Sequence, residues 1–197
     1  MKKKMELLLV VFAMALILSF GFDAKAEEIA STCGTGSITL NFGNSDYKEV
    51  QLLTRGGALK ESTNCYSSAY FYGIKSNTLY YCRYRYIDYY GDAITEWSSK
   101  KPCALFNVSV KLSRGKVRFK VPKVKGIKKF KIYMTTTSGS GYRKIKTLKP
   151  GKSFRVSKFK GKKFKYYKNY YYRVDAITNS GKKSVTSFSK GFYLYRY

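Results

Sequence analysis

The sequence predicts an all-β protein built as two tandem β-sandwiches behind an N-terminal signal peptide. Three observations lead to this prediction. The chain repeats itself with a period of about 85 residues, its apolar residues alternate with polar ones, and glycine-rich turn signals separate the alternating runs. We find no amphipathic helix of ordinary length after the signal peptide, which favours the all-β class over a mixed one.

The internal repeat sets the expected domain boundaries. Residues 77–87 align without gaps with residues 167–177, and residues 37–42 align with residues 116–121. A period of about 85 residues is too long for a solenoid unit and is typical of tandem domains. We therefore expect three segments: a signal peptide (1–26), a cysteine-containing first unit (27–102) and a strongly basic second unit (103–197).

Within each unit, apolar residues recur at every second position. Ile38, Leu40 and Phe42 alternate with polar residues in the first unit, and Val117 and Phe119 do so in the second. This period is typical of a strand with one buried face, not of a helix. Several such short strands, separated by turns, predict a β-sandwich in each unit.

The first 26 residues have the parts of an export signal. Residues 2–4 are lysines, residues 7–22 form an apolar run, and residues 24–26 supply alanines for cleavage. The run is shorter than the roughly 20 residues that a membrane-spanning helix needs. We expect a secreted, extracellular protein whose mature chain begins at Glu27 and keeps no transmembrane anchor after cleavage. An uncleaved anchor is the alternative.

Almost all of the excess positive charge lies in the second unit. Residues 27–102 carry eight Lys or Arg and eight Asp or Glu, whereas residues 103–197 carry 27 Lys or Arg and a single acid, Asp175. Summed charge governs association and not fold, so a net charge of +26 predicts an anionic polymer or surface as partner. A coding bias toward Lys and Tyr is the alternative, but it does not explain why acids vanish from one unit only.

Alternation places basic residues on both outer faces of the second unit. One face is expected to carry Lys111, Lys116, Arg118, Lys120 and Arg155. The other face carries the anion-binding candidates Lys129, Lys131, Tyr133, Tyr171 and Arg173. A third candidate surface is a loop, expected to be the least ordered of the three, that contains Lys158, Lys160, Lys162, Lys163 and Lys165. Like charges on adjacent strands repel, so such a sheet is more stable with an anion bound. The alternative for the lysine-rich loop is that it is merely solvated, and the alternative for Tyr133 and Tyr171 is that they are ordinary strand-surface tyrosines.

One strand of each unit follows a recognisable pattern. Tyr80 in the first unit and Tyr170 in the second open a strand with inward residues at alternate positions, and Ile74 and Thr78 precede Tyr80. In this pattern each unit resembles a fibronectin type III domain, an immunoglobulin-like β-sandwich, of the kind found in secreted Gram-positive proteins. The resemblance implies that Tyr80 and Tyr170 are corner tyrosines whose hydroxyls bond back to the preceding loop. It implies a fold and not a function, because this sandwich carries unrelated functions.

The four cysteines, Cys33, Cys65, Cys82 and Cys103, lie in the first unit or at its edge. Export makes disulfides the default, and four cysteines allow three connectivities. We expect Cys33 to end the first strand and Cys103 to lie just past the last strand, at the same pole of the sandwich, which favours pairing Cys33 with Cys103 and Cys65 with Cys82. Simple alternation points Cys65 outward and Cys82 inward, so the second pairing stays open. We expect no metal site, because the spacing does not suit zinc and the chain has no histidine.

The residue inventory argues against catalysis. Without histidine, Ser-His and Cys-His nucleophile pairs are excluded, and the second unit's single acid excludes paired carboxylates there. Asp88, Asp92 and Glu96 surround a predicted hairpin turn, where we interpret them as solvated loop charges. We therefore expect a binding or adhesion protein and not an enzyme, with no cofactor and no small-molecule substrate.

Three kinds of partner remain as hypotheses. The first is an anionic polymer of the cell envelope, such as teichoic acid, or another extracellular polyanion, which would make the protein cell-wall associated. The alternatives are extracellular nucleic acid, with a steep salt dependence, and a protein partner of an adhesin or spacer module. An exposed patch around Tyr66, Tyr70 and Tyr72 of the first unit would favour the protein partner.

Overall fold

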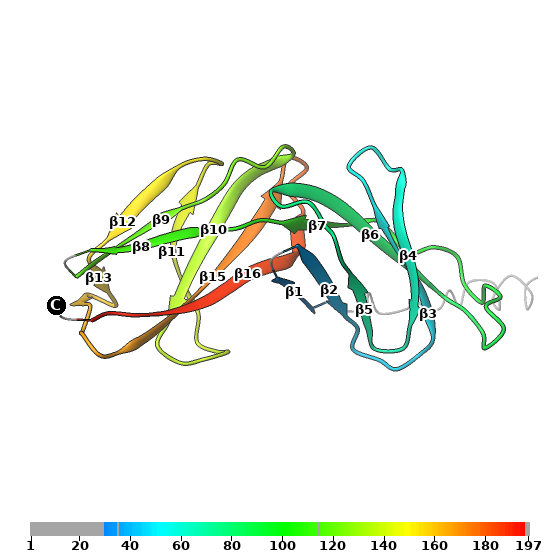
Figure 1. Ribbon diagram of the computed structural model, residues 1–197, viewed down its shortest axis with the longest axis horizontal. Coiled ribbons are helices and arrows are strands. Elements are labelled where there is room, and N and C mark those ends of the chain that lie inside the picture. Colours follow the sequence, from blue (N-terminus) through cyan, green and yellow to red (C-terminus); the bar gives the residue numbers. More distant parts are fainter. Residues whose placement is uncertain (1–29, 35, 114, 196–197) are drawn as a thin grey trace, which may run out of the picture.

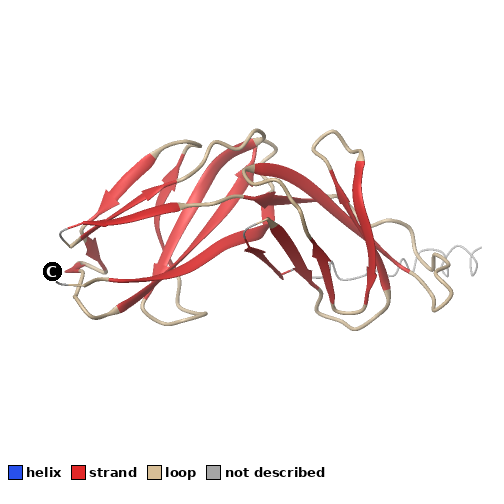
Figure 2. Cartoon of the chain, viewed as in Figure 1, coloured by secondary structure: helices blue, strands red, loops and turns tan. Residues whose placement is uncertain are grey.

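The computed structural model describes residues 30–34, 36–113 and 115–195. All regular elements in these residues are strands (Figure 2), so the predicted all-β class is confirmed. Within the same residues, no helix has the length and apolar character needed to cross a membrane. The predicted signal peptide, residues 1–26, lies outside the described residues.

The first unit is a sandwich of a three-stranded and a four-stranded layer (Figure 1). The three-stranded layer has the order β1 (Ala30–Gly34), β2 (Ser37–Asn41) and β5 (Ser68–Phe71). The facing layer has the order β4 (Leu59–Cys65), β3 (Lys48–Leu53), β6 (Thr78–Tyr86) and β7 (Lys101–Leu105).

The second unit repeats this arrangement. Its three-stranded layer has the order β12 (Ser153–Val156), β9 (Lys116–Lys120) and β8 (Ser109–Ser113). The facing layer has the order β11 (Arg143–Leu148), β10 (Ile127–Thr135), β15 (Asn169–Thr178) and β16 (Lys183–Tyr193). A small hairpin of β13 (Lys158–Phe159) and β14 (Lys162–Lys163) closes one end. The aligned segments 77–87 and 167–177 cover β6 and β15, which hold the same place in the two units.

Alternation along the strands produces the cores. In β9, Val117 and Phe119 are fully buried, whereas Lys116, Arg118 and Lys120 between them are exposed. The buried residues pack against Phe130, Ile132 and Met134 of β10, which alternate in the same way. Apolar burial of this kind is the main favourable term in folding, and here it leaves every second position of β9 free for charge.

Both corner tyrosines bond to the preceding loop. The Tyr80 hydroxyl accepts a hydrogen bond from the Lys75 backbone N–H at 3.3 Å. The Tyr170 hydroxyl accepts one from the Lys165 N–H at 3.0 Å, again five residues upstream. Each bond fixes the loop that leads into the strand carrying the tyrosine, β6 in the first unit and β15 in the second.

The two units share a sheet and part of a core. β16 pairs in parallel with β1, so the layers join into one seven-stranded sheet (Figure 1). Leu79 of β6 and Ala104 of β7, two strands of the first sandwich, belong to the core cluster of the second. Gly126, with φ of +93°, lies so close to Leu79 that a Cβ there would meet its Cδ2 at 2.7 Å. The two sandwiches therefore pack directly against each other and are not joined by a loose linker.

The passage between the units comes later than the predicted boundary at residue 102. β7 spans Lys101–Leu105 and pairs with β6, with Cys103 opposite Tyr80. The chain leaves the first sandwich only after Leu105. Pro102, the last residue of the expected first unit, lies in a strand at the edge of its layer, where a missing backbone N–H is tolerated.

The predicted pairing of Cys65 with Cys82 is not formed. Both side chains are buried, as is that of Cys103, and no disulfide joins any two of these three. Cys65 lies opposite Lys48 of β3, whereas Cys82 lies opposite Leu52, on the other side of that strand. The Cα atoms of Cys65 and Cys82 are therefore offset by four residues along the strands and by two strand spacings across the sheet. This separation exceeds ~10 Å, which is beyond the reach of a disulfide. The side chain of Cys33 lies outside the described residues.

Candidate anion-binding groove

The three-stranded layer of the second unit carries a row of adjacent cations on its outer face. Arg118 of β9 pairs directly with Lys111 of β8 on one side and with Arg155 of β12 on the other. All three side chains are exposed. The unit's single acid, Asp175, belongs to the opposite layer, so this row of three cations has no carboxylate on its face.

Hydroxyl groups flank the other cations of β9. Lys120 lies opposite Ser109 on β8 and opposite Ser153 on β12. The Arg118 guanidinium donates a hydrogen bond from Nη2 to the Ser153 Oγ at 3.1 Å. Lys116 lies opposite Ser113. The central row of three cations is therefore followed along β9 by Lys120 between two serines on one side and by Lys116 beside one serine on the other.

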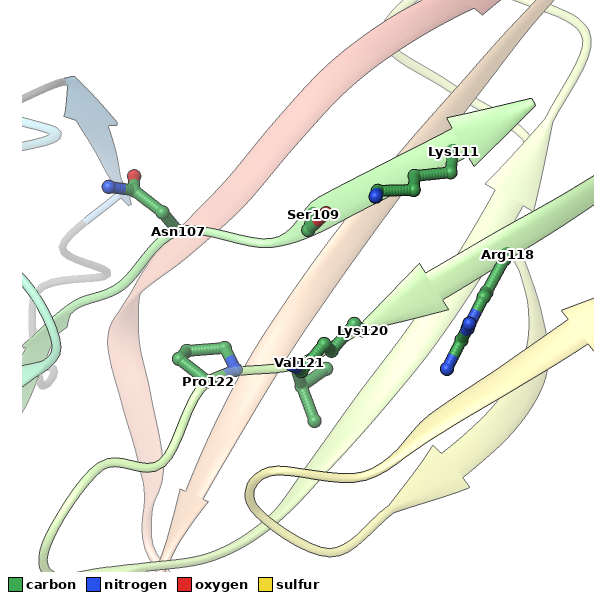
Figure 3. A pocket seen from close by; sticks show the side chains of 7 residues that line it. All are labelled: Asn107, Ser109, Lys111, Arg118, Lys120, Val121 and Pro122. Carbon is green, nitrogen blue, oxygen red and sulfur yellow. The ribbon is translucent and has the colours of Figure 1, made fainter.

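Three adjoining hollows run along β9. The first, of about 450 Å³, is lined by the residues labelled in Figure 3: Asn107, Ser109, Lys111, Arg118, Lys120, Val121 and Pro122. The second, of about 370 Å³, shares Lys111 and Arg118 and adds Ser113, Lys116 and Arg155. The third, of about 330 Å³, shares Lys116 and reaches Lys158, Lys163 and Tyr166. We call these three hollows together the basic groove.

The lysine-rich loop, expected to be the least ordered of the three surfaces, forms a short hairpin of β13 and β14. Lys158 pairs with Lys163 across a two-residue turn at Lys160 and Gly161, whose φ angles are 51° and 76°. Positive φ at both turn positions is typical of a tight hairpin. All five predicted lysines of this segment, Lys158, Lys160, Lys162, Lys163 and Lys165, are exposed.

Two buried aromatic residues hold the hairpin in place. Phe159 and Phe164 pack edge-on against the Tyr170 ring, with centroid distances of 6.5 and 5.0 Å. These contacts hold Lys158 and Lys163 at the end of the three-stranded layer, where they line the third hollow with Lys116. Two surfaces that are separate in the sequence therefore form one groove.

The second predicted face is partly neutralised. The Arg173 guanidinium lies between the rings of Tyr133 and Tyr142, at 4.9 and 5.0 Å from their centroids. Its Nε lies 3.3 Å from Asp175 Oδ1, and Lys183 Nζ lies 3.3 Å from Oδ2 of the same buried carboxylate. Arg173 therefore has a carboxylate and two aromatic partners within the protein.

The remaining candidates on that face have limited exposure. Lys129, Lys131, Tyr133 and Tyr171 are half-buried, and Lys131 lies directly opposite Asp175. Burial raises the pKa of Tyr133; the Asp175 charge adds to this effect and the Arg173 charge opposes it. The phenol is thus neutral at ordinary pH. This face offers an anion fewer free cations than the basic groove does.

The basic side chains at the centre of the first unit are also engaged internally. Arg83 donates two hydrogen bonds to Gln51 Oε1, at 3.0 and 2.8 Å, and Arg85 donates one to Glu49 Oε2 at 2.8 Å. Both guanidinium groups stack on the Trp97 ring, with Cζ at 4.3 and 4.7 Å from its centroid. These contacts stabilise the sheet and leave the two guanidinium groups engaged within the first unit.

The acidic turn of the first unit is held by its own hydrogen bonds. Asp88 Oδ1 accepts a bond from the Asp92 N–H at 2.8 Å, and the Asp88 N–H donates to the Asp92 carbonyl at 2.9 Å. In the part of the chain that the structure describes, no three acidic or cysteine side chains gather as a metal site would require. Elsewhere in this unit Tyr66, Tyr70 and Tyr72 are 55%, 52% and 69% exposed.

No protein-family model and no curated protein matches the sequence. The two units are fibronectin type III-like sandwiches. Their repeated three- and four-stranded layers and both corner tyrosines carry this assignment.

Solved structures with similarity to this chain include the FN1–FN3 domains of chicken CNTN1, at 14% identity and a TM-score of 0.36, covering 85% of this chain and 64% of that one. A two-domain fibronectin type III segment of chicken tenascin has 9% identity and a TM-score of 0.35, covering 85% and 97%. A cytokine receptor complex has 10% identity and a TM-score of 0.37, covering 86% and 97%.

The sequence identified the cations of the groove but not its hydroxyl groups or its continuity. Ser109, Ser113 and Ser153 occupy the same alternate positions as the cations, and this shared spacing could have predicted that the serines lie on the same face. The junction with the hairpin depends on where Phe159 and Phe164 pack, which no local pattern reveals.

Proposed function

We propose that this chain is a non-catalytic binding protein whose second unit holds a linear polyanion in the basic groove. The observation that carries the proposal is the row formed by Lys111, Arg118 and Arg155, which lie side by side without an acid on their face. Like charges on adjacent strands are unfavourable, and a bound anion relieves the repulsion. The groove is elongated, which suits a chain better than a single small anion.

The charge of the groove is sufficient for firm but salt-sensitive attachment. Seven cations line its three hollows: Lys111, Lys116, Arg118, Lys120, Arg155, Lys158 and Lys163. Each Lys or Arg near an anionic surface contributes about 1 kcal/mol, so contact with half of them supplies several kcal/mol. At moderate ionic strength the attraction between exposed charges more than about 10 Å apart is largely screened, so binding should weaken as salt is added.

The polyanion that fits an exported chain is a polymer of the cell envelope. The predicted signal peptide directs the protein outward, and a teichoic acid is the anionic polymer that the resemblance to Gram-positive secreted proteins favours. On this account the protein is extracellular and associated with the cell wall through charge. The first unit then serves as a spacer or as a second recognition module.

A protein partner for the first unit is the second candidate function. Tyr66, Tyr70 and Tyr72 are each more than half exposed, and tyrosine is enriched at protein interfaces. This candidate is independent of the groove. It predicts that removing groove charges leaves binding of such a partner unchanged.

Sedimentation with Gram-positive cell walls tests the proposed function. The two-domain chain, residues 27–197, is used, because a fragment that begins at 103 would cut β7 and separate Leu79 from the second core. Walls are tested intact and stripped of teichoic acid, over a range of salt. We expect binding to intact walls that falls with salt and is lost on stripping.

Two matched variants locate the binding. The triple groove variant combines Lys111→Gln, Arg118→Gln and Arg155→Gln and removes the positive charge of the row. The β11 control combines Arg143→Gln, Lys144→Gln and Lys146→Gln and removes the same amount of charge from exposed positions of β11. The first variant should lose most wall binding and the second should keep it. Equal losses would mean that net charge alone acts and that the groove is not the site.

A further inference from the structure

The cations of β9 are regularly spaced along the groove. Lys116, Arg118 and Lys120 occupy alternate positions and are all exposed, with Val117 and Phe119 buried between them. Alternate residues on one face of a strand repeat every ~6.6 Å. The floor of the groove is therefore a row of positive charges with a fixed period.

A glycerol phosphate polymer has the same period as a strand. Two residues of peptide contain six backbone bonds, and a chain of glycerol units joined by phosphodiesters also has six bonds from one phosphorus to the next. An extended chain of six such bonds spans about 7 Å. By the same scale, a ribitol phosphate repeat with eight bonds spans roughly 9 Å and a polyphosphate repeat with two bonds roughly 2 Å. Only a six-bond repeat stays in step with successive cations of β9.

The lining of the groove distinguishes between polymers that share this spacing. A single-stranded nucleic acid also has six backbone bonds per phosphate, but its binding sites stack bases on aromatic side chains. The first two hollows contain no aromatic residue in their lining, whereas Phe164 and Tyr166 line the third, at the hairpin end of the groove. The first two contain Ser109 and Ser113, and Ser153 lies beside Lys120, so hydroxyl donors and acceptors stand next to the cations. This composition suits a polyol between phosphates.

We infer that the basic groove holds an extended poly(glycerol phosphate) chain along β9, with successive phosphates on Lys120, Arg118 and Lys116. Lys111 and Arg155 flank the central phosphate from β8 and β12. The serine hydroxyls bond to the glycerol units and their oxygens. This inference rests on the proposed function and specifies the repeat of the polymer.

Competition between polymers tests the spacing. Labelled poly(glycerol phosphate) bound to residues 27–197 is displaced by unlabelled poly(glycerol phosphate), poly(ribitol phosphate), polyphosphate or oligothymidylate, each with the same number of phosphates. We expect poly(glycerol phosphate) to compete at a concentration about tenfold lower than each of the others. Counterion release alone predicts the opposite order, with the densely charged polyphosphate as the best competitor.

The outcomes separate the inference from the function on which it rests. If polyphosphate competes best while the triple groove variant still loses binding, the spacing is wrong and the groove remains a polyanion site. If oligothymidylate competes equally well, the polyol assignment is wrong and the site fits a nucleic acid. If the triple groove variant binds every polymer as the β11 control does, the proposed function itself fails.

A single substitution gives an independent check on register. Arg118→Gln removes the central charge of the row and should weaken poly(glycerol phosphate) binding on the order of fivefold. The same change should weaken polyphosphate less, because a densely charged chain can slide to other cations. Equal weakening of both polymers would overturn the one-phosphate-per-cation arrangement.

Discussion

Asn77 and Tyr167 occupy the same position in the two units, and both have a left-handed backbone, with φ of 56° and 58°. The aligned segments place one directly over the other. Each residue precedes the strand that carries the corner tyrosine of its unit. Asparagine adopts this conformation readily, whereas a bulky side chain does so at a cost. The second unit therefore carries backbone strain that the first avoids.

Replacing Tyr167 with the residue found in the first unit should stabilise the protein. Tyr167→Asn is expected to raise the free energy of unfolding by about 1 kcal/mol, because the left-handed conformation penalises most side chains by that amount. The Tyr167 side chain is 63% exposed, so little packing is lost. Urea denaturation measures the change, and Asn77→Tyr should lower stability by a similar amount. A Tyr167→Asn variant no more stable than the parent would contradict this account of strain.

The contact between the units predicts coupled unfolding. The Thr186 hydroxyl accepts a hydrogen bond from the Ala104 N–H at 2.7 Å and donates one to the Ala104 carbonyl at 2.8 Å, in a fully buried position. Thr186→Val should cost roughly 1–3 kcal/mol, because the variant leaves buried polar groups less well satisfied. Thr147→Val, at an exposed position of β11, is the control.

Fluorescence separates the two units in this experiment, since the single tryptophan, Trp97, lies in the first unit. Circular dichroism reports strands of both units. In the parent chain the two signals should change together, and in Thr186→Val they should separate. Separate transitions in the parent chain would show that the shared sheet does not couple the units.

Alternation predicted the strands and the cations of β9 because burial of Val117 and Phe119 is a local consequence of sequence. The repeat predicted the tandem architecture because equivalent positions of the two units align directly in the sequence, as the match of Asn77 with Tyr167 illustrates. The interface escaped prediction because Ser184 and Thr186 read as surface residues, and their partner Ala104 lies some 80 residues away. The failed pairing of Cys65 with Cys82 has a similar cause, since strand register is set by hydrogen bonds between distant segments.

Acid should weaken the first unit through Glu49. Burial raises the pKa of this carboxyl, but hydrogen bonds from Arg85, Ser62 and Gln51 and the charge of Arg85 outweigh it and hold the pKa below the usual 4.5. A lowered pKa in the folded state means that the charged form stabilises the fold above pH 4.5 and that this contribution is lost as the pH falls through the folded value.

Glu49→Gln should therefore be less stable than the parent chain at neutral pH and should lose less stability on acidification. Urea midpoints measured by Trp97 fluorescence across the acid range test this. Glu61→Gln, on the edge strand β4, serves as a comparison. The same acid dependence in Glu49→Gln as in the parent would show that other groups set it.

The crowded cations of the groove predict a stabilising substitution. Arg118→Gln should raise the free energy of unfolding by a few tenths of a kcal/mol to about 1 kcal/mol in low salt, because Arg118 stands between Lys111 and Arg155. High salt should abolish the gain. Lys144→Gln is the control, since Lys144 pairs with Tyr133 and not with a cation. A loss of stability in Arg118→Gln would mean that repulsion is not the dominant effect in this row.

The central claim is that a polyanion lies in the basic groove, and protection of individual lysines from acylation tests it most directly. The chain is labelled with and without poly(glycerol phosphate), and modified lysines are quantified by mass spectrometry. The account predicts that Lys111, Lys116 and Lys120 become protected while Lys144 and Lys146 on the opposite layer remain reactive. Uniform protection of all these lysines, or protection confined to Lys129 and Lys131, would contradict it.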